Sequence, residues 1–299
     1  MKVSKLLECS YDVDILGITD DSRNIKEGYM FVATKGFNVD HFDYIDDAIN
    51  NGAVFVVCDR EVDINVPYLL VNDINDLYIE LCSKFYDVSS DEFKLIGITG
   101  TDGKTTTSTV IYQLLENIGC IGTNGVLVND KYYDVNNTTP CISELYSSLS
   151  LIKNNSCKDI VMEVSSEALL HNRLKKFKFD IVCFTNITED HLNVHKTIEN
   201  YRNCKFKLLD LLDDNGIVII NGDDENCKLI DRNNLYRIGF GSDNDFVISN
   251  VNELSRKVEF TINYKGNILD FGKDFTRINY VEKLTEILGF NFLDITDPQ

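Results

Sequence analysis

The chain has 299 residues, enough for two domains that each bury a core of their own. Hydrophobic residues make up 43% of it and only 3 residues are proline, a composition typical of a globular protein. The formal net charge of -19 repels nucleic acid and anionic membranes, so neither is an expected partner. The same charge argues against a helicase or recombinase.

The 9 cysteines are scattered along the chain without a CxxC pair, and several lie inside apolar runs. We expect them to be small core residues of a reducing compartment rather than zinc ligands or disulfide partners. The N-terminus lacks the apolar segment of a signal peptide, and no apolar run approaches membrane-spanning length. The expectation is a cytoplasmic protein without membrane insertion.

Residues 1–88 are predicted to form a small α/β domain. Short apolar runs predict strands at 29–33, 53–58 and 67–71, and helical periodicity predicts helices at 44–50 and 75–86. The polar triplet Asp21-Ser22-Arg23 follows the end of an early strand and is either an ordinary turn or part of a site. The polar stretch 88–92 is the expected linker to a second domain, residues 89–299.

The second domain begins with a strand containing Leu95, Ile96 and Ile98, followed by the glycine turn 100–103 and by Lys104-Thr105-Thr106-Thr107. An apolar helical pattern then runs to Ile118, with Gly119 as its expected C-terminal cap. This order is typical of a phosphate cradle, in which backbone N–H groups and a lysine contact phosphates. The spacing is shorter than in the general P-loop, and a corner with a chance lysine is the alternative. ATP or GTP binding is the working hypothesis.

Further nearly continuous apolar runs at 159–164, 180–184 and 216–220 predict strands buried on both faces. Helical patterns at 142–152 and 197–212 separate them. The alternation predicts a doubly wound α/β domain with a mostly parallel sheet.

Polar residues follow each of these strands, where ligands of such sheets lie. Any one of them could be a helix cap, but polar groups after four successive strands, the glycine turn among them, favour a ligand site. They are Glu163, Ser165, Ser166, Thr185, Asn186, Glu189, Asp190, His191, Asn221, Asp223 and Asp224.

His191 and His195 are four residues apart but lack the glutamate of HExxH and a nearby thiol, so contact with Mg²⁺ or phosphate is favoured over zinc. Lys205 lies on the apolar stripe of its predicted helix. It is either a lysine that extends its amine to the surface, or an inward lysine with a lowered pKa or a modified amine. Arg173 and the lysines after it suggest a second anionic ligand or a solvated basic loop.

Taken together, the motifs resemble those of the Mur ligase family. The likeness runs from about residue 15 to Asp294 and is greatest to the subgroup that adds the third amino acid to UDP-N-acetylmuramoyl-dipeptide in peptidoglycan synthesis. Its motifs are 99–107 (TGTDGKTTT), 137–140 (NTTP), 162–166 (MEVSS) and 184–192 (FTNITEDHL), followed by His195, Tyr201 and Lys205.

The resemblance implies three sets of site residues. For ATP these are Gly100, Thr101, Asp102, Gly103, Lys104, Thr105, Thr106 and, at the adenine, Asn279. For the UDP-N-acetylmuramoyl peptide they are Ser22 at the UDP end and Asn137, Thr138, Thr139, Ser165, His171 and Arg173 at the sugar-peptide part. For Mg²⁺ they are Thr105 with Glu163, and His191 with a carbamylated Lys205. Lys104, Glu163, His191 and Lys205 are the expected catalytic residues.

The implied reaction transfers a phosphoryl group from ATP to the terminal carboxylate of the substrate, after which an amino acid attacks the acyl phosphate to give an amide. This sequence differs from the family at Asp102 (more often Asn), Glu167 (often His), Thr276 (Asn) and Asp40-His41 (no intervening glycine).

The chain ends at Gln299, where the resemblance implies a third, C-terminal domain. A fragment, or a short form completed by a partner chain, is expected. A ligase is therefore one hypothesis and a non-catalytic module that binds UDP-muramoyl peptide or ATP another. An unrelated P-loop kinase is disfavoured by the 137–140 and 162–166 motifs and by Lys205.

Overall fold

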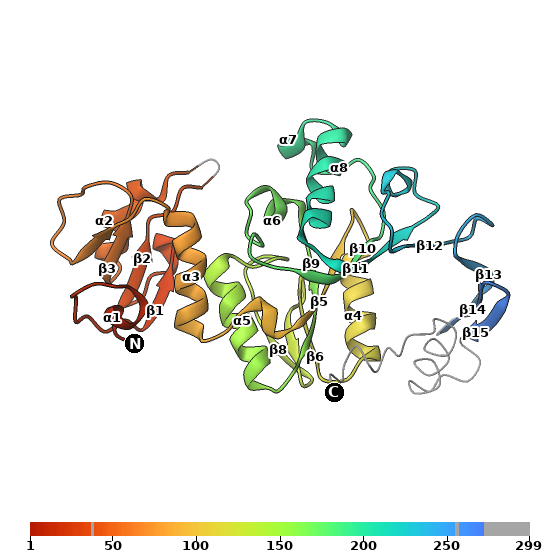
Figure 1. Ribbon diagram of the computed structural model, residues 1–299, viewed down its shortest axis with the longest axis horizontal. Coiled ribbons are helices and arrows are strands. Elements are labelled where there is room, and N and C mark those ends of the chain that lie inside the picture. The colour runs from red at the N-terminus through yellow and green to blue at the C-terminus, as the bar shows by residue number, and fades with distance from the viewer. Residues whose placement is uncertain (37–38, 255–256, 272–299) are drawn as a thin grey trace. The chain divides into compact units, whose positions relative to one another are not determined.

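The computed structural model describes residues 1–36, 39–254 and 257–271, which form two compact units (Figure 1). The first unit combines Met1–Ser90 with Pro140–Asn154 and His171–Lys176. The second combines Asp91–Thr139 and Asn155–Leu170 with the described residues from Phe177 onward. The segments 140–154 and 171–176 therefore group with the first unit, whereas the sequence placed them in the second domain. The functional domain boundary at 88/89 stays a prediction.

The first unit is built on a four-stranded, all-parallel sheet in the order β1-β2-β3-β4. Its strands are β1 (Gly17–Thr19), β2 (Tyr29–Val32), β3 (Ala53–Cys58) and β4 (Tyr68–Leu70). Its helices are α1 (Val3–Leu6), α2 (Ile45–Asn50), α3 (Ile74–Tyr86) and α5 (Ile142–Asn154), with 3-10 turns at Ser22–Asn24 and His41–Tyr44. The predicted strands and helices of this region are confirmed with ends shifted by one residue. The apolar runs of β2 and β3 form the core because both faces of the sheet are covered.

Helix α3 shows how local chemistry fixes these elements. The Asp73 carboxylate caps its start by accepting a hydrogen bond from the Asp76 N–H, and Asp87 ends it in a left-handed conformation with φ of 51°. Its apolar face, including Tyr78 and Leu81, is buried, and α3 packs against α5.

The second unit contains an 11-stranded sheet in the order β15-β14-β13-β12-β11-β10-β5-β9-β6-β7-β8. Strands β13, β12, β11, β10, β5, β9 and β6 are parallel to their neighbours in that central run, and antiparallel pairs extend both edges. The strands are β5 (Lys94–Thr99), β6 (Ile118–Gly122), β7 (Gly125–Val128), β8 (Lys131–Tyr133), β9 (Asp159–Glu163), β10 (Phe179–Phe184), β11 (Leu212–Asn221), β12 (Leu235–Gly239), β13 (Phe246–Leu254), β14 (Lys257–Tyr264) and β15 (Asn267–Phe271).

The helices of this unit are α4 (Lys104–Leu114), α6 (Ser166–Leu170), α7 (Leu192–His195) and α8 (Ile198–Phe206), with 3-10 turns at Lys207–Leu211 and Cys227–Leu229; a further one, Ser90–Glu92, spans the change from the first unit to the second. Figure 1 shows α4 and α8 on opposite sides of the central strands, as in a doubly wound sheet. The predicted fold class is confirmed. The chain crosses from β5 to β6, returns to β9 and then continues on the other side of β5 with β10. The loops after β5, β9 and β10 consequently meet at one edge of the sheet, the position at which such sheets bind ligands.

Two predicted helix ends are wrong. Helix α4 ends at Leu114, because Leu115 is extended and Asn117 has a left-handed φ of 53°. Ile118 and Gly119 then begin β6, where Ile118 packs beside Ile98 in the core. The helix predicted over 197–212 is α-helical only to Phe206 and finishes as a 3-10 turn.

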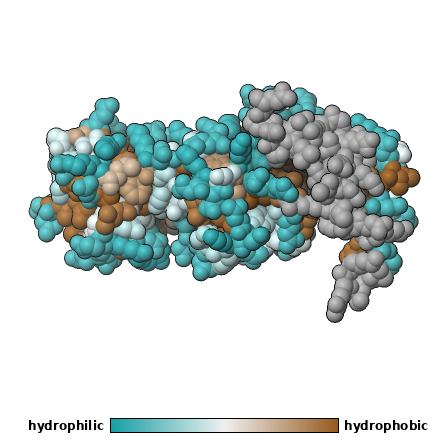
Figure 2. Space-filling view, turned by 90° about the horizontal axis from the view of Figure 1, so that it is seen from below, coloured by the Kyte–Doolittle hydropathy of each residue, from teal (hydrophilic) through white to brown (hydrophobic). Residues whose placement is uncertain are grey.

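All nine cysteines are free thiols and six of them are buried, as predicted for core residues. On the face seen in Figure 2, hydrophilic side chains predominate at the periphery and apolar ones lie between them. Among the described residues, no helix combines the length and apolarity required to cross a membrane.

Candidate functional site

The loop between β5 and α4 depends on two glycines. Gly100 has φ of +154°, and a Cβ there would lie 1.9 Å from Thr185 Oγ1. Gly103 has φ of +81° and precedes the first residue of α4, Lys104. A side chain at either position would meet a neighbour or strain the backbone, so the loop needs glycine where the sequence has it.

The segment after β10 holds this loop in place. The Asn186 carbonyl accepts a hydrogen bond from the Thr101 N–H at 2.8 Å, and its side-chain oxygen accepts one from the Asp102 N–H at 2.9 Å. Thr185 Oγ1 donates to the Asp102 carbonyl at 2.6 Å. The loop backbone is therefore fixed, while the first N–H groups of α4 have no partner within the helix. A preformed anion site at the start of α4 results.

Two lysines meet at one carbonyl oxygen of the loop. Lys104 Nζ donates to the Gly100 carbonyl at 2.9 Å and to the Thr101 carbonyl at 2.8 Å. Lys205 Nζ donates to the same Gly100 oxygen at 2.7 Å. Burial lowers the pKa of the Lys104 amine. The two amines therefore lie close together at the glycine loop.

Lys205 is buried, with 1% of the residue exposed, and so the inward alternative from the sequence is correct. Its pKa is lowered to about 7, first by burial and then by the charge of Lys104. Its Nζ lies 4.5 Å from the centre of the Tyr201 ring, and the ring of His191 lies 6.0 Å from the same centre. Both residues expected at a second cation therefore lie near the Tyr201 ring.

His191 and His195 have different surroundings. The side chain of His191 is 51% exposed and lies 3.5 Å from the Asp190 carboxylate. His195 is buried, and its Nε2 lies 3.1 Å from Ser166 Oγ. Burial lowers the pKa of His195. Within the described residues, no group of three or more His, Cys, Asp and Glu side chains is arranged to hold a metal.

Glu163, at the end of β9, is the buried carboxylate of the site, with 1% of the residue exposed. Its Oε2 accepts hydrogen bonds from Thr105 Oγ1 at 2.9 Å and from Thr123 Oγ1 at 3.1 Å. Its Oε1 accepts one from the Thr123 N–H at 2.9 Å. Three donors therefore orient the carboxylate toward the first turn of α4.

This donor set suits Mg²⁺. Mg²⁺ is commonly held by one or two carboxylates together with the phosphates of a substrate, and it prefers oxygen ligands. Glu163 and the Thr105 hydroxyl offer such oxygens beside the phosphate loop. Among the described residues Glu163 forms no ion pair, but its charge interacts with that of Lys104.

The 137–139 segment joins the site through its threonines. Thr139 Oγ1 donates to the Glu163 carbonyl at 2.7 Å and accepts from the Ser165 N–H at 2.9 Å. Thr138 Oγ1 lies 3.1 Å from Thr123 Oγ1. Asn137 is exposed beside them, and Ser165 Oγ accepts a hydrogen bond from the Ala168 N–H at the start of α6.

The remaining predicted residues lie elsewhere. Ser22 is buried in the first unit, and His171 and Arg173 belong to the same unit. Of the basic cluster near them, Lys175 pairs with Asp76 at 2.6 Å. Asn279 and Thr276 lie outside the described residues.

Thr123 and Gly122 lie against Glu163 but are not among the residues predicted for the site. Gly122 ends β6 and Thr123 follows it. Because Ile118 and Gly119 were predicted to end a helix, the strand that brings these two residues to Glu163 was not predicted. The sequence offers one sign of this site: a threonine directly after a pair of apolar residues flanked by two glycines, at 119–123.

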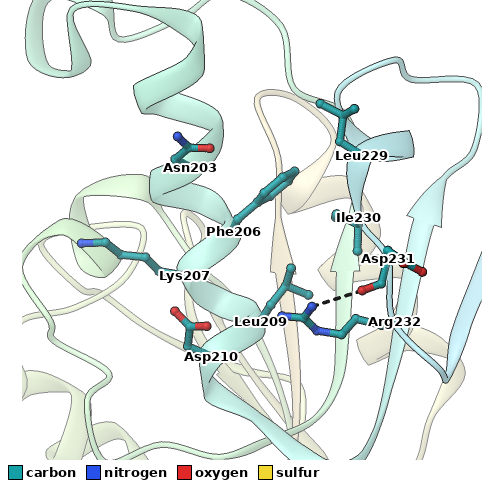
Figure 3. A pocket seen from close by; sticks show the side chains of 9 residues that line it. All are labelled: Asn203, Phe206, Lys207, Leu209, Asp210, Leu229, Ile230, Asp231 and Arg232. Carbon is teal, nitrogen blue, oxygen red and sulfur yellow. Dashed lines mark hydrogen bonds between the residues drawn. The ribbon is translucent and has the colours of Figure 1, made fainter.

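A hollow of about 270 Å³ lies on another part of the second unit, between α8 with its 3-10 extension and the segment 229–232 (Figure 3). None of the predicted site residues lines it. Its walls are formed by Asn203, Phe206, Lys207, Leu209, Asp210, Leu229, Ile230, Asp231 and Arg232.

The doubly wound sheet, the glycine loop and the lysine at the start of α4 define an α/β protein of the P-loop class. The chain belongs to the Mur ligase family: residues 98–275 match the Mur ligase middle domain, and residues 14–87 match the model described as Mur ligase family, catalytic domain.

Similar proteins agree with this assignment. The chain is 40% identical over 226 residues to the UDP-N-acetylmuramoyl-L-alanyl-D-glutamate--2,6-diaminopimelate ligase of Fusobacterium nucleatum, covering 74% of this chain and 46% of that protein. It is 31% identical to the enzyme of that name from Bacteroides thetaiotaomicron, covering 91% of this chain and 56% of that protein. The chain thus spans about half the length of the curated relatives it matches.

Solved structures share the fold. A structure of a UDP-N-acetylmuramoyl-L-alanyl-D-glutamate--2,6-diaminopimelate ligase superposes with a TM-score of 0.71 at 19% identity, covering 99% of this chain and 65% of that one. The MurF ligase from Thermotoga maritima, in complex with ADP, gives a TM-score of 0.60 at 21% identity, covering 95% of this chain and 66% of that one.

Proposed function

We propose that this chain supplies the ATP site and the UDP-substrate site of an amide ligase. The ligase adds an amino acid to UDP-N-acetylmuramoyl-L-alanyl-D-glutamate and forms ADP and phosphate. The observation that carries the proposal is the buried Glu163 carboxylate, hydrogen-bonded to Thr105 where a phosphate loop enters α4. The names of the similar proteins support the choice of substrate.

In this proposal the loop residues hold the phosphates of ATP. The N–H groups at the start of α4 and the Lys104 amine supply positive charge to the outer phosphates. Thr105 and Glu163 hold Mg²⁺, which neutralises phosphate charge when it is bound. The loop set is Gly100, Thr101, Asp102, Gly103, Lys104, Thr105 and Thr106, and Asn279 is proposed at the adenine.

Phosphoryl transfer to a carboxylate brings two anions together, so it chiefly requires neutralisation and alignment. Lys104, whose amine donates to two loop carbonyls, is proposed to contact the transferred group. His191 is proposed to assist at a second cation, together with a modified Lys205.

A neutral lysine amine can add CO₂, forming an N–C bond and releasing a proton, and the product is a carboxylate-like carbamate. The pKa of Lys205, lowered to about 7, supports this because it leaves much of the amine uncharged near neutral pH. Two ammonium groups at the Gly100 oxygen repel each other, and the carbamate would replace that repulsion by attraction to Lys104.

The residues proposed for the acceptor substrate are those that the family resemblance implies. Ser22 is assigned to the UDP end. The sugar-peptide part is assigned to Asn137, Thr138, Thr139, Ser165, His171 and Arg173.

The test measures phosphate release from ATP with UDP-N-acetylmuramoyl-L-alanyl-D-glutamate and an amino acid, in bicarbonate buffer. Release that needs both co-substrates, and that is lost in Lys104→Met, supports a ligase. Binding of ATP and the UDP-peptide without turnover supports the second candidate, a binding module. The absence of both binding and turnover would refute both candidates.

A further inference from the structure

Thr123, in the turn between β6 and β7, contacts both oxygens of the Glu163 carboxylate. Its N–H donates to Oε1 at 2.9 Å, and its hydroxyl donates to Oε2 at 3.1 Å. The same hydroxyl lies 3.1 Å from Thr138 Oγ1. Because a threonine hydroxyl has a single proton, and this one goes to Glu163, Thr138 is the donor in the second contact. A directed chain of hydrogen bonds therefore runs from Thr138 through Thr123 to Glu163.

The backbone of β6 is shaped to allow this contact. A Cβ on Gly122 would lie 2.1 Å from Glu163 Oε1, so any other residue there would displace the carboxylate. The parallel pairing of Ile121 with Met162 brings the end of β6 level with the end of β9. The close approach is thus part of the sheet register.

We infer that Thr123 is a positioning residue: it fixes the Glu163 carboxylate for a divalent cation and links it to Thr138. The inference rests on the proposed function, in which Glu163 holds Mg²⁺ beside ATP. A carboxylate has about four lone-pair directions. Three are occupied by Thr105 and Thr123, so the carboxylate is held with one direction open. Hydrogen bonds of this kind orient metal-binding carboxylates, and their loss commonly costs ten- to a hundredfold in metal affinity.

The test is calorimetric titration of the whole chain with ATP, once with Mg²⁺ and once with EDTA. Thr123→Val keeps the shape and the N–H and removes only the hydroxyl. Thr123→Ser keeps the hydroxyl. Thr261→Val is the matched control, because Thr261 Oγ1 also donates to a carboxylate, that of Asp270 at 2.8 Å, in the distant strand β14.

Thr123→Val is expected to weaken ATP binding about tenfold in Mg²⁺ and to leave binding in EDTA unchanged. Thr123→Ser and Thr261→Val are expected to bind like wild type in both buffers. If Thr123→Val loses ATP affinity equally in both buffers, or does not lose it, the inference is overturned. In that case Mg²⁺-dependent ATP binding by the wild type still upholds the proposed function. A wild type whose ATP binding ignores Mg²⁺ would overturn the proposed function and this inference together. Thr123→Ser serves as the folded reference if Thr123→Val unfolds.

Discussion

Replacing Lys205 by methionine removes a buried amine and should remove a pH-dependent part of the protein's stability. Burial lowers the pKa of this lysine from 10.5 to about 7 in the folded chain. Between these values the unfolded chain binds a proton that the folded chain lacks. The free energy of unfolding of the wild type therefore rises with pH in this window, and below pH 7 the buried charge reduces stability.

The magnitude follows from the same two values. From pH 7 to pH 9 the folded amine goes from half protonated to nearly neutral, while the unfolded amine stays mostly charged. At about 1.4 kcal/mol per unit of pKa difference, this window contributes about 2 kcal/mol. Methionine has a similar length and no charge, so Lys205→Met should lack this contribution. Its free energy of unfolding should exceed that of wild type by the largest amount at or below pH 7.

The assay is urea unfolding of wild type and Lys205→Met at pH 7 and pH 9, in buffer freed of CO₂ so that the amine stays unmodified. The difference between the two proteins should change by about 2 kcal/mol across this range. Lys207→Met is the control, because Lys207 is exposed two residues further on. A difference that stays constant from pH 7 to pH 9 would refute the lowered pKa and with it the argument for an uncharged amine.

Three further predictions, made with four substitutions, test other parts of the account. Gly100→Ala should destabilise the fold by about 3 kcal/mol, because its Cβ would lie 1.9 Å from Thr185 Oγ1. Gly103→Ala would have no atom nearer than 3.8 Å and should cost only about 1 kcal/mol, for its left-handed φ. Equal losses of unfolding free energy for the two variants in urea would contradict this. Burial raises the pKa of Asp159 to about 6, so the charged form of this residue lowers the free energy of unfolding as pH rises from 4 to 6. The free energy of unfolding of Asp159→Asn should be about 2–3 kcal/mol higher than that of wild type above pH 6, with no gain below pH 4. Asp102→Asn removes an exposed negative charge from the phosphate loop and should tighten ATP binding about two- to fivefold at low salt, an effect that calorimetry should find reduced at high salt.

Much of the fold follows from local sequence patterns. The continuous apolar runs of β5, β9 and β10 predict buried parallel strands because both of their faces are covered by helices. The helical period alone placed Lys205 on an apolar stripe, and the residue is indeed buried. Both predictions depend only on neighbours in the sequence.

Where the outcome depends on distant contacts, the sequence was less informative. The apolar residue Ile118 fits a helix as well as a strand, and pairing with β9 decides for the strand. The contact of Thr123 with Glu163 spans 40 positions and exists only through the register of β6 on β9. The edge strands β13 to β15 were not predicted, although the alternation of apolar and polar residues along β14 is typical of a half-buried strand.

The most direct test of the central claim, an ATP site at the start of α4, is hydrogen exchange with and without Mg²⁺-ATP. The account predicts slower exchange of backbone amides in residues 100–106, with no change at the opposite end of the sheet around Asp159. In Lys104→Met this protection should disappear. Protection that maps to another part of the chain, or none at all at saturating ATP, would contradict the assignment.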